Sequence, residues 1–222
     1  MPRERNPLIR RGGFIEAEKF YVLAYEGNVS EKKYFEDLRL SEYFNDSGSI
    51  ETIALKKGKT DSSNPLSVKA LLARAKQDYN FRPTDEFWLI IDRDQWETIH
   101  KINLEALYQD CQREQNFHIA LSNPCFEMWL ILHFKAVTEI SDADKALLLE
   151  NAATSAKHHF VDDYLTICMD NGRGYNKRPD PKIFLPRLNV AIENAEQASE
   201  AQEHFPKTLG SDVFKLVKKL IK

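Results

Sequence analysis

The sequence predicts an α/β protein with a mainly parallel sheet flanked by helices. Residues 87–91 form an unbroken apolar and aromatic run, which is typical of a central strand covered on both faces. A second such run, residues 20–25, leads directly into a helical pattern, and the pattern of residues 66–75 leads back to the central run. This order of strands and helices favours a parallel sheet.

Composition limits the classes of protein that fit. The 222 residues are 42% hydrophobic, enough for one sizeable core with a helical appendage. The net charge of −3 argues against nucleic-acid binding through bulk charge but allows a local basic surface beside an acidic metal site. The three cysteines lack zinc-site or disulfide spacing, which indicates buried thiols in a reducing cytoplasm. Without a long apolar run or a secretory h-region, we expect a cytoplasmic protein that does not contact the membrane.

The chain begins with a basic arm. Residues 1–18 carry four arginines, two prolines and a Gly12-Gly13 pair, a composition that predicts a flexible segment. A solvated tail is the simpler interpretation, and contact with phosphates or an acidic partner is the alternative.

The first strand, 20–25, ends in Glu26 and Gly27, and a helix is expected to follow from Ser30 to Leu40. Glu26 is the first acidic candidate for a site. A glycine directly after it lets the backbone turn sharply and approach a ligand. The aromatic and leucine positions of the helix recur at helical spacing and are expected to pack on the sheet.

A second strand over 49–55 leads into the loop 56–60, which contains Gly58-Lys59-Thr60. A nucleotide-binding P-loop is excluded, because that motif needs a glycine where Ile53 stands. Lys57 and Lys59 are candidate phosphate-binding residues, although exposed lysine loops are often only solvated.

The central strand ends in Asp92-Arg93-Asp94. In parallel sheets ligands bind beyond the carboxyl ends of the strands, so both carboxylates are expected at the functional edge. Hard oxygen ligands of this kind suit Mg²⁺ or Mn²⁺. Aspartates that merely cap or turn the chain are the structural alternative.

The next informative stretch follows a helix over 104–114 and a strand over 117–121. Ser122 or Asn123 is expected to cap an apolar helix that contains Glu127 and His133. A buried carboxylate needs a metal, a cation or backbone donors, so Glu127 is a candidate, with a structural pair to an arginine as the alternative. His133 is interpreted as a core histidine with satisfied hydrogen bonds.

Beyond residue 140 the sequence predicts helices over 141–151, 157–169, 181–203 and 211–222, without a further convincing strand. The loop 170–182 combines Tyr175 with basic residues. Arg173, Lys177 and Lys182 are candidates for holding a phosphate while the aromatic ring stacks on a base. A solvated linker fits the same composition equally well.

Several motifs in this order resemble the RloB family. They are Glu26-Gly27 with Glu31 and Tyr34-Phe35, then Asp92-Arg93-Asp94, then Ser122-Asn123-Pro124 with Phe126-Glu127, Trp129 and His133-Phe134. The resemblance spans most of the chain. The family in turn resembles the Toprim superfamily, in which a glutamate after the first strand and an Asp-x-Asp after a later strand bind Mg²⁺ for phosphodiester chemistry. It implies a Toprim-like α/β core over 19–135 and a helical C-terminal region over 136–222.

The resemblance implies a Mg²⁺-dependent nuclease that acts in antiphage defence by abortive infection. RloB-like proteins occur near restriction-modification genes and are commonly paired with an AAA-type ATPase, which is the expected protein partner. Glu26, Asp92, Asp94 and Glu127 are the implied catalytic residues, and the first three are the implied metal ligands. Whether Glu26 is a ligand or a general base stays open.

The substrate is expected to be nucleic acid, and RNA, including tRNA, and DNA both remain open because no motif encodes specificity. Two other functions fit the sequence. One is a non-catalytic regulatory or adaptor subunit of an ATPase defence complex. The other is a metal-dependent enzyme that acts on small phosphorylated molecules.

Overall fold

The computed structural model describes residues 19–27, 29–45, 50–54, 64–78, 80–93, 96–97, 100–114, 116–156, 158–170, 172, 174–199 and 204–222. The basic arm and four predicted site residues, Lys57, Lys59, Asp94 and Arg173, lie outside these residues. The strands are β1 (Lys19–Tyr25), β2 (Ile50–Ala54), β3 (Glu86–Asp92), β4 (Phe117–Asn123) and β5 (Gly210–Ser211). The helices are α1 (Ser30–Arg39), α2 (Pro65–Asp78), α3 (Leu104–Arg113), α4 (Glu127–Ile131), α5 (Asp142–Glu150), α6 (Phe160–Met169), α7 (Pro181–Phe184), α8 (Leu188–Ser199) and α9 (Val213–Leu220).

The strands form one sheet in the order β2-β1-β3-β4-β5. The first four are mutually parallel, and only β5 pairs antiparallel, with β4. The predicted mainly parallel sheet is thus confirmed, with β3 at its centre. Tyr25 pairs with Ile90 and Asp92 with Ser122, so β1, β3 and β4 end at one common edge.

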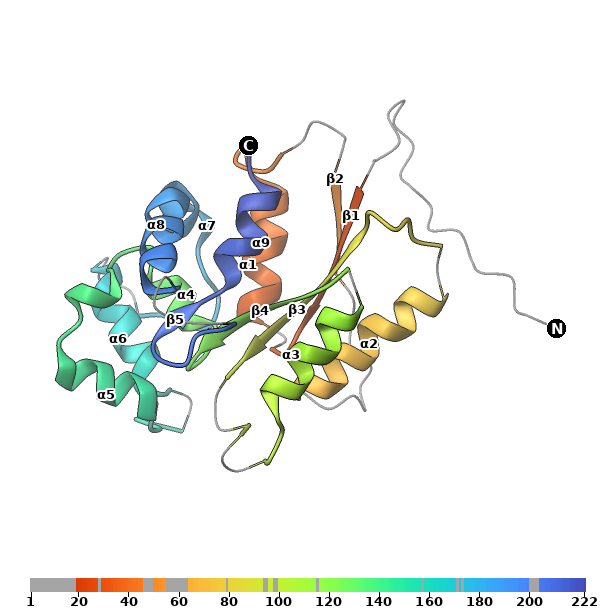
Figure 1. Cartoon of the computed structure of the whole chain (residues 1–222). Helices are drawn as coiled ribbons and strands as arrows, with labels where there is room; N and C mark the ends of the chain where they lie inside the picture. The colour runs from red at the N-terminus through yellow and green to blue at the C-terminus, as the bar shows by residue number, and fades with distance from the viewer. Residues whose placement is uncertain are drawn as a thin grey trace.

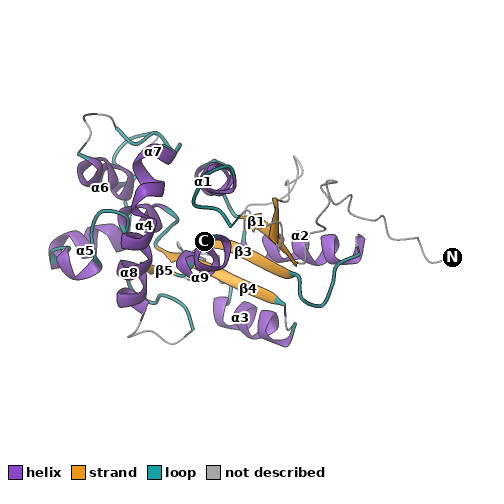
Figure 2. Ribbon diagram, turned by 90° about the horizontal axis from the view of Figure 1, so that it is seen from above, coloured by secondary structure: helices purple, strands orange, loops and turns teal. Residues whose placement is uncertain are grey.

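Helices cover both faces of this sheet (Figures 1 and 2). Side chains alternate along β1, so Val22 and its even-numbered neighbours pack with α2 and α3, while Leu23 and its odd-numbered neighbours pack with α1 and α9. The aromatic face of α1, which includes Tyr34 and Phe35, belongs to the second core as expected. Burial on both faces explains the continuous apolar sequence of β1 and β3.

The helices α4 to α8 gather beyond the end of the sheet toward which β3 and β4 point (Figure 1). The predicted helix 181–203 is divided into α7, a 3-10 turn over Leu185–Arg187 and α8. Pro186 stands in that turn, and because proline has no backbone N–H it interrupts the regular hydrogen bonding of an α-helix.

The segment before the last helix contains a strand that the sequence analysis missed. β5 has only two residues, too few to show an alternating pattern. It pairs Ser211 with Ser122 and Gly210 with Asn123, and α9 then packs its apolar face on the sheet. The C-terminal segment therefore returns to the sheet.

This pairing also corrects the expected start of the helix after β4. Ser122 and Asn123 are strand residues, and the helix begins at Glu127 without a side-chain cap. The hydroxyl of Ser122 is hydrogen-bonded to that of Ser211 at 2.8 Å, both being buried. The prediction was wrong because a polar residue that pairs with a distant strand has the same local sequence as a helix cap.

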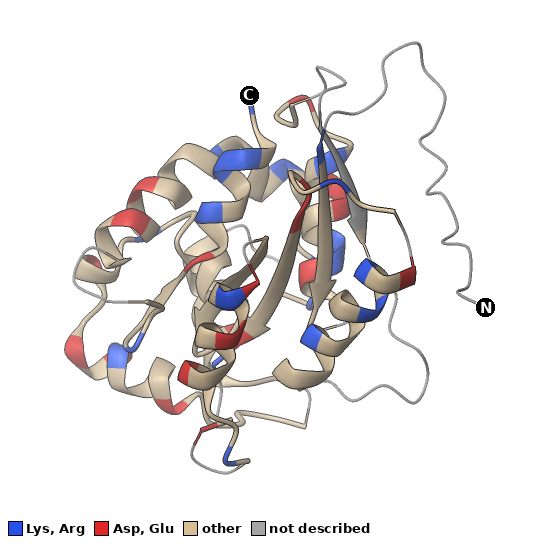
Figure 3. Cartoon of the chain, turned by 45° about the vertical axis from the view of Figure 1, so that its right-hand side comes forward, with Lys and Arg blue, Asp and Glu red and all other residues tan. Residues whose placement is uncertain are grey.

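Charges of both signs are interspersed along the helices that surround the sheet (Figure 3). This distribution agrees with the small net charge of −3. Within the residues that the structure describes, no helix combines the length and the apolar character that crossing a membrane requires.

Candidate functional site

Glu26 and Asp92 are brought together by the pairing of β1 with β3. Glu26 is the first residue after β1, and its backbone N–H donates to the carbonyl of Ile90 at 2.9 Å. Its side-chain Oε2 then accepts a hydrogen bond from the backbone N–H of Asp92 at 3.0 Å. Although it is charged, Glu26 is buried, with 5% of its surface exposed. The two acidic positions therefore share the carboxyl edge of the sheet, as the sequence predicts.

Trp96 is a second hydrogen-bond partner of Glu26. Its indole Nε1 donates to Oε1 of Glu26 at 2.9 Å, so both oxygens of the carboxylate accept hydrogen bonds. Hydrogen bonds to a charged acceptor are stronger than neutral ones, and these two hold the plane of the carboxylate in one orientation. Trp96 was not a candidate in the sequence analysis. The available indication was a tryptophan in a polar segment four residues after Asp92.

Gly27 allows a close approach of Glu31 to the backbone. The backbone N–H of Gly27 donates to Oε1 of Glu31 at 2.7 Å, and a Cβ at Gly27 would lie 2.3 Å from the same oxygen. Glu31 is itself buried in the first turn of α1. The Glu-Gly sequence thus accommodates a second buried carboxylate next to the strand end.

Arg93 anchors the chain that leaves β3. Its backbone N–H donates to the carbonyl of Ser122, while its guanidinium donates to Glu97 at 2.7 Å and to the carbonyl of Pro206 at 2.9 Å. The side-chain amide of Asn123 also donates to Pro206, at 3.3 Å. The middle residue of the Asp-x-Asp motif therefore ties the site to the segment that precedes β5.

The residues at this edge fit a magnesium ion. Mg²⁺ is usually bound by one or two carboxylates, several waters and substrate phosphates. Glu26 and Asp92 supply two carboxylates at one edge, the number and type of protein ligands that such a site uses. Among the described residues no group of three His, Cys, Asp or Glu side chains is arranged to hold a metal. Asp94, the third predicted ligand, is outside these residues.

Glu127 lies in a separate buried cluster. Its Oε1 accepts hydrogen bonds from the hydroxyl of Ser30 at 3.0 Å, from the hydroxyl of Tyr175 at 3.1 Å and from Nζ of Lys177 at 3.2 Å. Its Oε2 accepts from the thiol of Cys125 at 3.2 Å. The predicted need of Glu127 for a cation is met by a lysine of the 170–182 loop.

Lys177 connects two buried acids. Its Nζ lies 3.2 Å from Glu127 and 2.6 Å from Oδ1 of Asp162, whose side chain is fully buried. The backbone of Lys177 is left-handed, with φ of 62°, and its carbonyl oxygen lies 3.2 Å from the hydroxyl oxygen of Ser30. A lysine in this conformation costs about 1–3 kcal/mol and persists because the surrounding contacts fix it. This arrangement holds the 170–182 loop against α1, α4 and α6.

The charges of this cluster reinforce each other. Burial alone raises the pKa of Glu127, but the Lys177 ammonium and the Cys125 thiol outweigh it and hold the pKa below its ordinary value. Burial alone lowers the pKa of Lys177, but Glu127 and Asp162 outweigh it and raise the pKa. Burial also raises the pKa of Tyr175, and Glu127 adds to this shift, so the phenol stays protonated. The cluster is therefore an ion pair with a neutral tyrosine donor.

The other two predicted residues take different positions. Lys182 is exposed at the start of α7, where its backbone N–H donates to the side chain of Asp180. His133 is buried, with Nδ1 2.9 Å from the carbonyl of Trp129 and Nε2 3.1 Å from the hydroxyl of Tyr34. Burial lowers the pKa of His133 to about 3, so the ring is neutral, as expected for a core histidine.

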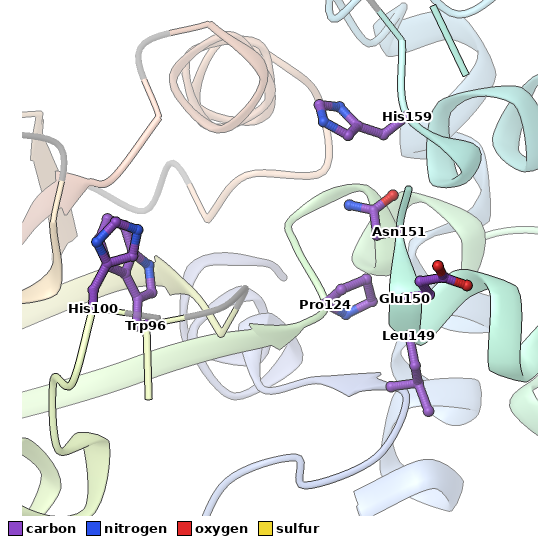
Figure 4. A pocket seen from close by; sticks show the side chains of 7 residues that line it. All are labelled: Trp96, His100, Pro124, Leu149, Glu150, Asn151 and His159. Carbon is purple, nitrogen blue, oxygen red and sulfur yellow. The ribbon is translucent and has the colours of Figure 1, made fainter. Parts of the chain in front are cut away.

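A pocket of about 350 Å³ opens beside the carboxylate edge (Figure 4). Trp96 and His100 stand on one side, Pro124 follows the end of β4, and residues from α5 and the start of α6 stand on the other side. Among the described residues, those that line it are Trp96, His100, Pro124, Leu149, Glu150, Asn151 and His159. Trp96 belongs both to this pocket and to the hydrogen bonds of Glu26. The other lining residues lie on loops and helix ends, where sequence spacing does not reveal proximity.

Comparison with protein families gives one clear result. The family model described as RloB-like protein matches residues 21–220, which cover nearly the whole chain and include most of β1 and all of β2 to β5. Comparisons with curated proteins and with solved structures give no significant match. The matched residues include Glu26, Asp92 and the Glu127 cluster. On this evidence the chain belongs to the RloB-like family.

Proposed function

We infer that this protein is a Toprim-like, Mg²⁺- or Mn²⁺-dependent nuclease that hydrolyses phosphodiester bonds of nucleic acid. The observation that carries the proposal is the hydrogen bond of 3.0 Å between Glu26 and the N–H of Asp92, which unites two acidic strand ends at the ligand-binding edge of a parallel sheet. A divalent ion held there would supply Lewis-acid activation of a phosphate and of a water molecule.

The residues of the chain have distinct roles in this proposal. Asp92, which is half-buried at the strand end, and Glu26 would hold the ion, with Asp94 of the same motif as a further ligand. Trp96 and the backbone amide of Asp92 orient the Glu26 carboxylate. The Glu127 cluster is assigned a positioning role, because Lys177 is already paired with two acids and holds the 170–182 loop in place.

The setting that we propose is antiphage defence, with an AAA-type ATPase as partner. Membership of the RloB-like family supports this setting through the resemblance described above. Co-purification of the ATPase encoded beside this chain, followed by a phage-challenge assay with wild-type protein and Asp92→Asn, tests it. Protection that persists in the folded Asp92→Asn variant would favour the adaptor function over the nuclease.

The nuclease proposal itself is tested by metal binding and by cleavage. Titration calorimetry with Mg²⁺ and Mn²⁺ is expected to show binding to the wild type and its loss in Glu26→Gln and Asp92→Asn. Glu193→Gln, an exposed acid on α8, is the matched control and is expected to bind as the wild type does. Labelled RNA and DNA, single-stranded and duplex, then serve as substrates with and without the ATPase.

Retained metal binding in both acidic-edge variants would place the ion elsewhere and contradict the proposed site. Cleavage that continues in the presence of excess chelator would contradict metal dependence. Circular dichroism of each variant shows whether a loss of binding reflects the missing carboxylate rather than unfolding.

A further inference from the structure

We propose that the pocket beside the carboxylate edge receives one unpaired nucleobase, which stacks on Trp96. The substrate is therefore single-stranded or locally unpaired nucleic acid. This inference rests on the proposed nuclease function, because it specifies the substrate class of the same site.

The size of the pocket favours a single nucleotide unit. Its volume of about 350 Å³ lies near the lower end of the range of about 300–1,000 Å³ that is typical of small-molecule sites. A base within a duplex is covered on both faces by its neighbours, so it reaches such a pocket only after leaving the stack. A single strand presents its bases without this cost.

The aromatic wall supplies a stacking surface that is already in place. Trp96 is partly exposed, and its indole is fixed by the bond of 2.9 Å to Glu26. The centroid of the His100 ring lies 4.6 Å from that of the indole, with 44° between the two planes, so His100 packs against Trp96 and helps to fix the position of the indole. Stacking of a base on an aromatic side chain accepts every base, because each has a π face.

The opposite wall is polar. Glu150, Asn151 and His159 are among the residues that line it. Asn151 is oriented by the backbone N–H of Val161, which donates to its Oδ1 at 3.2 Å. An amide side chain both donates and accepts hydrogen bonds, so this wall can contact the polar edge of any base.

Trp96 also links base binding to the acidic edge. One end of its indole touches Glu26, and its ring forms part of the pocket wall. A nucleotide whose base stacks there has its phosphate backbone next to Glu26 and Asp92. His159, on the opposite wall, is connected to the Glu127 cluster through Asp162. The side chain of Asp162 accepts a hydrogen bond from the backbone N–H of His159 at 3.0 Å and forms an ion pair with Lys177.

Tryptophan fluorescence tests the proposal without requiring cleavage. Of the three tryptophans, Trp88 and Trp129 are 3% and 0% exposed, so quenching by a stacked base reports on Trp96. In metal-free buffer, single-stranded oligonucleotides are expected to quench the emission, and duplexes of the same sequence are not. Deoxy- and ribo-oligonucleotides titrated in parallel separate DNA from RNA as the source of the base.

Variants identify the groups involved, with affinity measured by fluorescence anisotropy of labelled single strands. Trp96→Ala is expected to weaken binding about 5- to 150-fold, while Trp96→Phe keeps most of the affinity because a phenyl ring still stacks. His204→Ala, an exposed aromatic residue beside Tyr108 and outside the pocket, is the control and is expected to leave affinity unchanged.

Three results would overturn the proposal: duplexes that bind as tightly as single strands, Trp96→Ala with wild-type affinity, or no binding of nucleic acid by the wild type. If Trp96→Ala fails to fold, an abasic scan of the substrate replaces it. One abasic position is then expected to reduce binding by the wild-type protein, and unchanged binding at every position would equally overturn the proposal.

Failure of the pocket and failure of the nuclease function give different results. Metal-dependent cleavage that no abasic position alters leaves the nuclease in place and removes the base pocket. Quenching and loss of affinity in Trp96→Ala without any metal binding keep the base pocket and remove the nuclease.

Discussion

The carboxylate of Glu26 accepts a hydrogen bond from the backbone N–H of Asp92, 66 residues further along the chain. The bond exists because β1 and β3 are adjacent and parallel, which places the residue after one strand beside the last residue of the other. The same carboxylate accepts from Trp96. Glu26 therefore stabilises the edge of the sheet as well as offering a metal ligand, and its substitution has two separable effects.

Glu26→Ala is expected to lower the free energy of unfolding by about 1–2 kcal/mol, because it leaves two partly buried donors without their acceptor. Glu26→Gln retains one acceptor oxygen and is expected to cost less. Urea denaturation followed by far-ultraviolet circular dichroism measures both. Wild-type stability in both variants would show that neither hydrogen bond contributes to stability.

Gly27→Ala is expected to destabilise the protein by about 1–3 kcal/mol, because its Cβ would lie 2.3 Å from Oε1 of Glu31. Gly174→Ala is the matched control, since a Cβ there meets no atom within 4 Å. The double variant with Glu31→Ala removes the clash, so it is expected to be less destabilised than the sum of the single changes. Additive losses, measured by thermal unfolding, would contradict the steric explanation.

Lys177→Met is expected to cost about 2–3 kcal/mol, because it leaves Glu127 and Asp162 buried without their cation. This loss of stability is smaller than that expected for breaking a fully buried ion pair, because 39% of the Lys177 side chain is exposed and water reaches it. Lys182→Met, at an exposed lysine of the same region, is expected to change stability little. Chemical denaturation of both variants makes the comparison, and similar losses would argue against the ion-pair cluster.

Because His133 is buried, we expect the folded protein to lose stability in mild acid. Its pKa is lowered to about 3 by burial, so the unfolded chain, with a histidine pKa near 6.5, binds the proton first. Stability from this group is complete above about pH 6.5 and decreases as the pH falls toward 3, by about 2 kcal/mol between pH 7 and pH 5. The lowered pKa of Glu127 acts only below its ordinary range, outside this window.

Urea denaturation at pH 7 and pH 5 measures this effect, with His133→Asn as the diagnostic variant and the exposed His204→Asn as control. His133→Asn is expected to be less stable at pH 7 but to show a smaller decrease toward pH 5 than the wild type. The same decrease in His133→Asn as in the wild type would assign the acid sensitivity to other groups, such as His118, whose pKa is also lowered, mainly by burial.

The sequence was sufficient to predict the parts of the fold that depend on local pattern. The apolar runs of β1 and β3, and the acidic residues that end them, predicted a parallel sheet with Glu26 and Asp92 at one edge. Successive residues of these strands pack alternately against the helices on the two faces of the sheet, so every position is apolar and the strands are recognisable as continuous apolar runs. The burial of Glu127 also predicts a partner, which the sequence analysis gives as a metal, a cation or backbone donors, with an arginine pair as the structural alternative. The cation in the structure is Lys177.

The remaining features depend on contacts between distant residues. β5 has two residues and becomes a strand only because Ser211 meets Ser122. The pocket combines Trp96 with Asn151 and His159, whose proximity no spacing in the sequence indicates. Gly27 was expected to serve a ligand, whereas the described contact at its backbone is with Glu31.

The antiparallel addition of β5 has a consequence for biosynthesis. The edge of β4 that pairs with β5 is complete only when Ser211 is available, 89 residues after its partner Ser122. While the chain is being made, the hydrogen-bonding groups at the end of β4 therefore remain open long after β1, β3 and β4 have been synthesised, and such an edge can pair with other chains. The nascent protein therefore keeps this edge open until the segment before its last helix has been made.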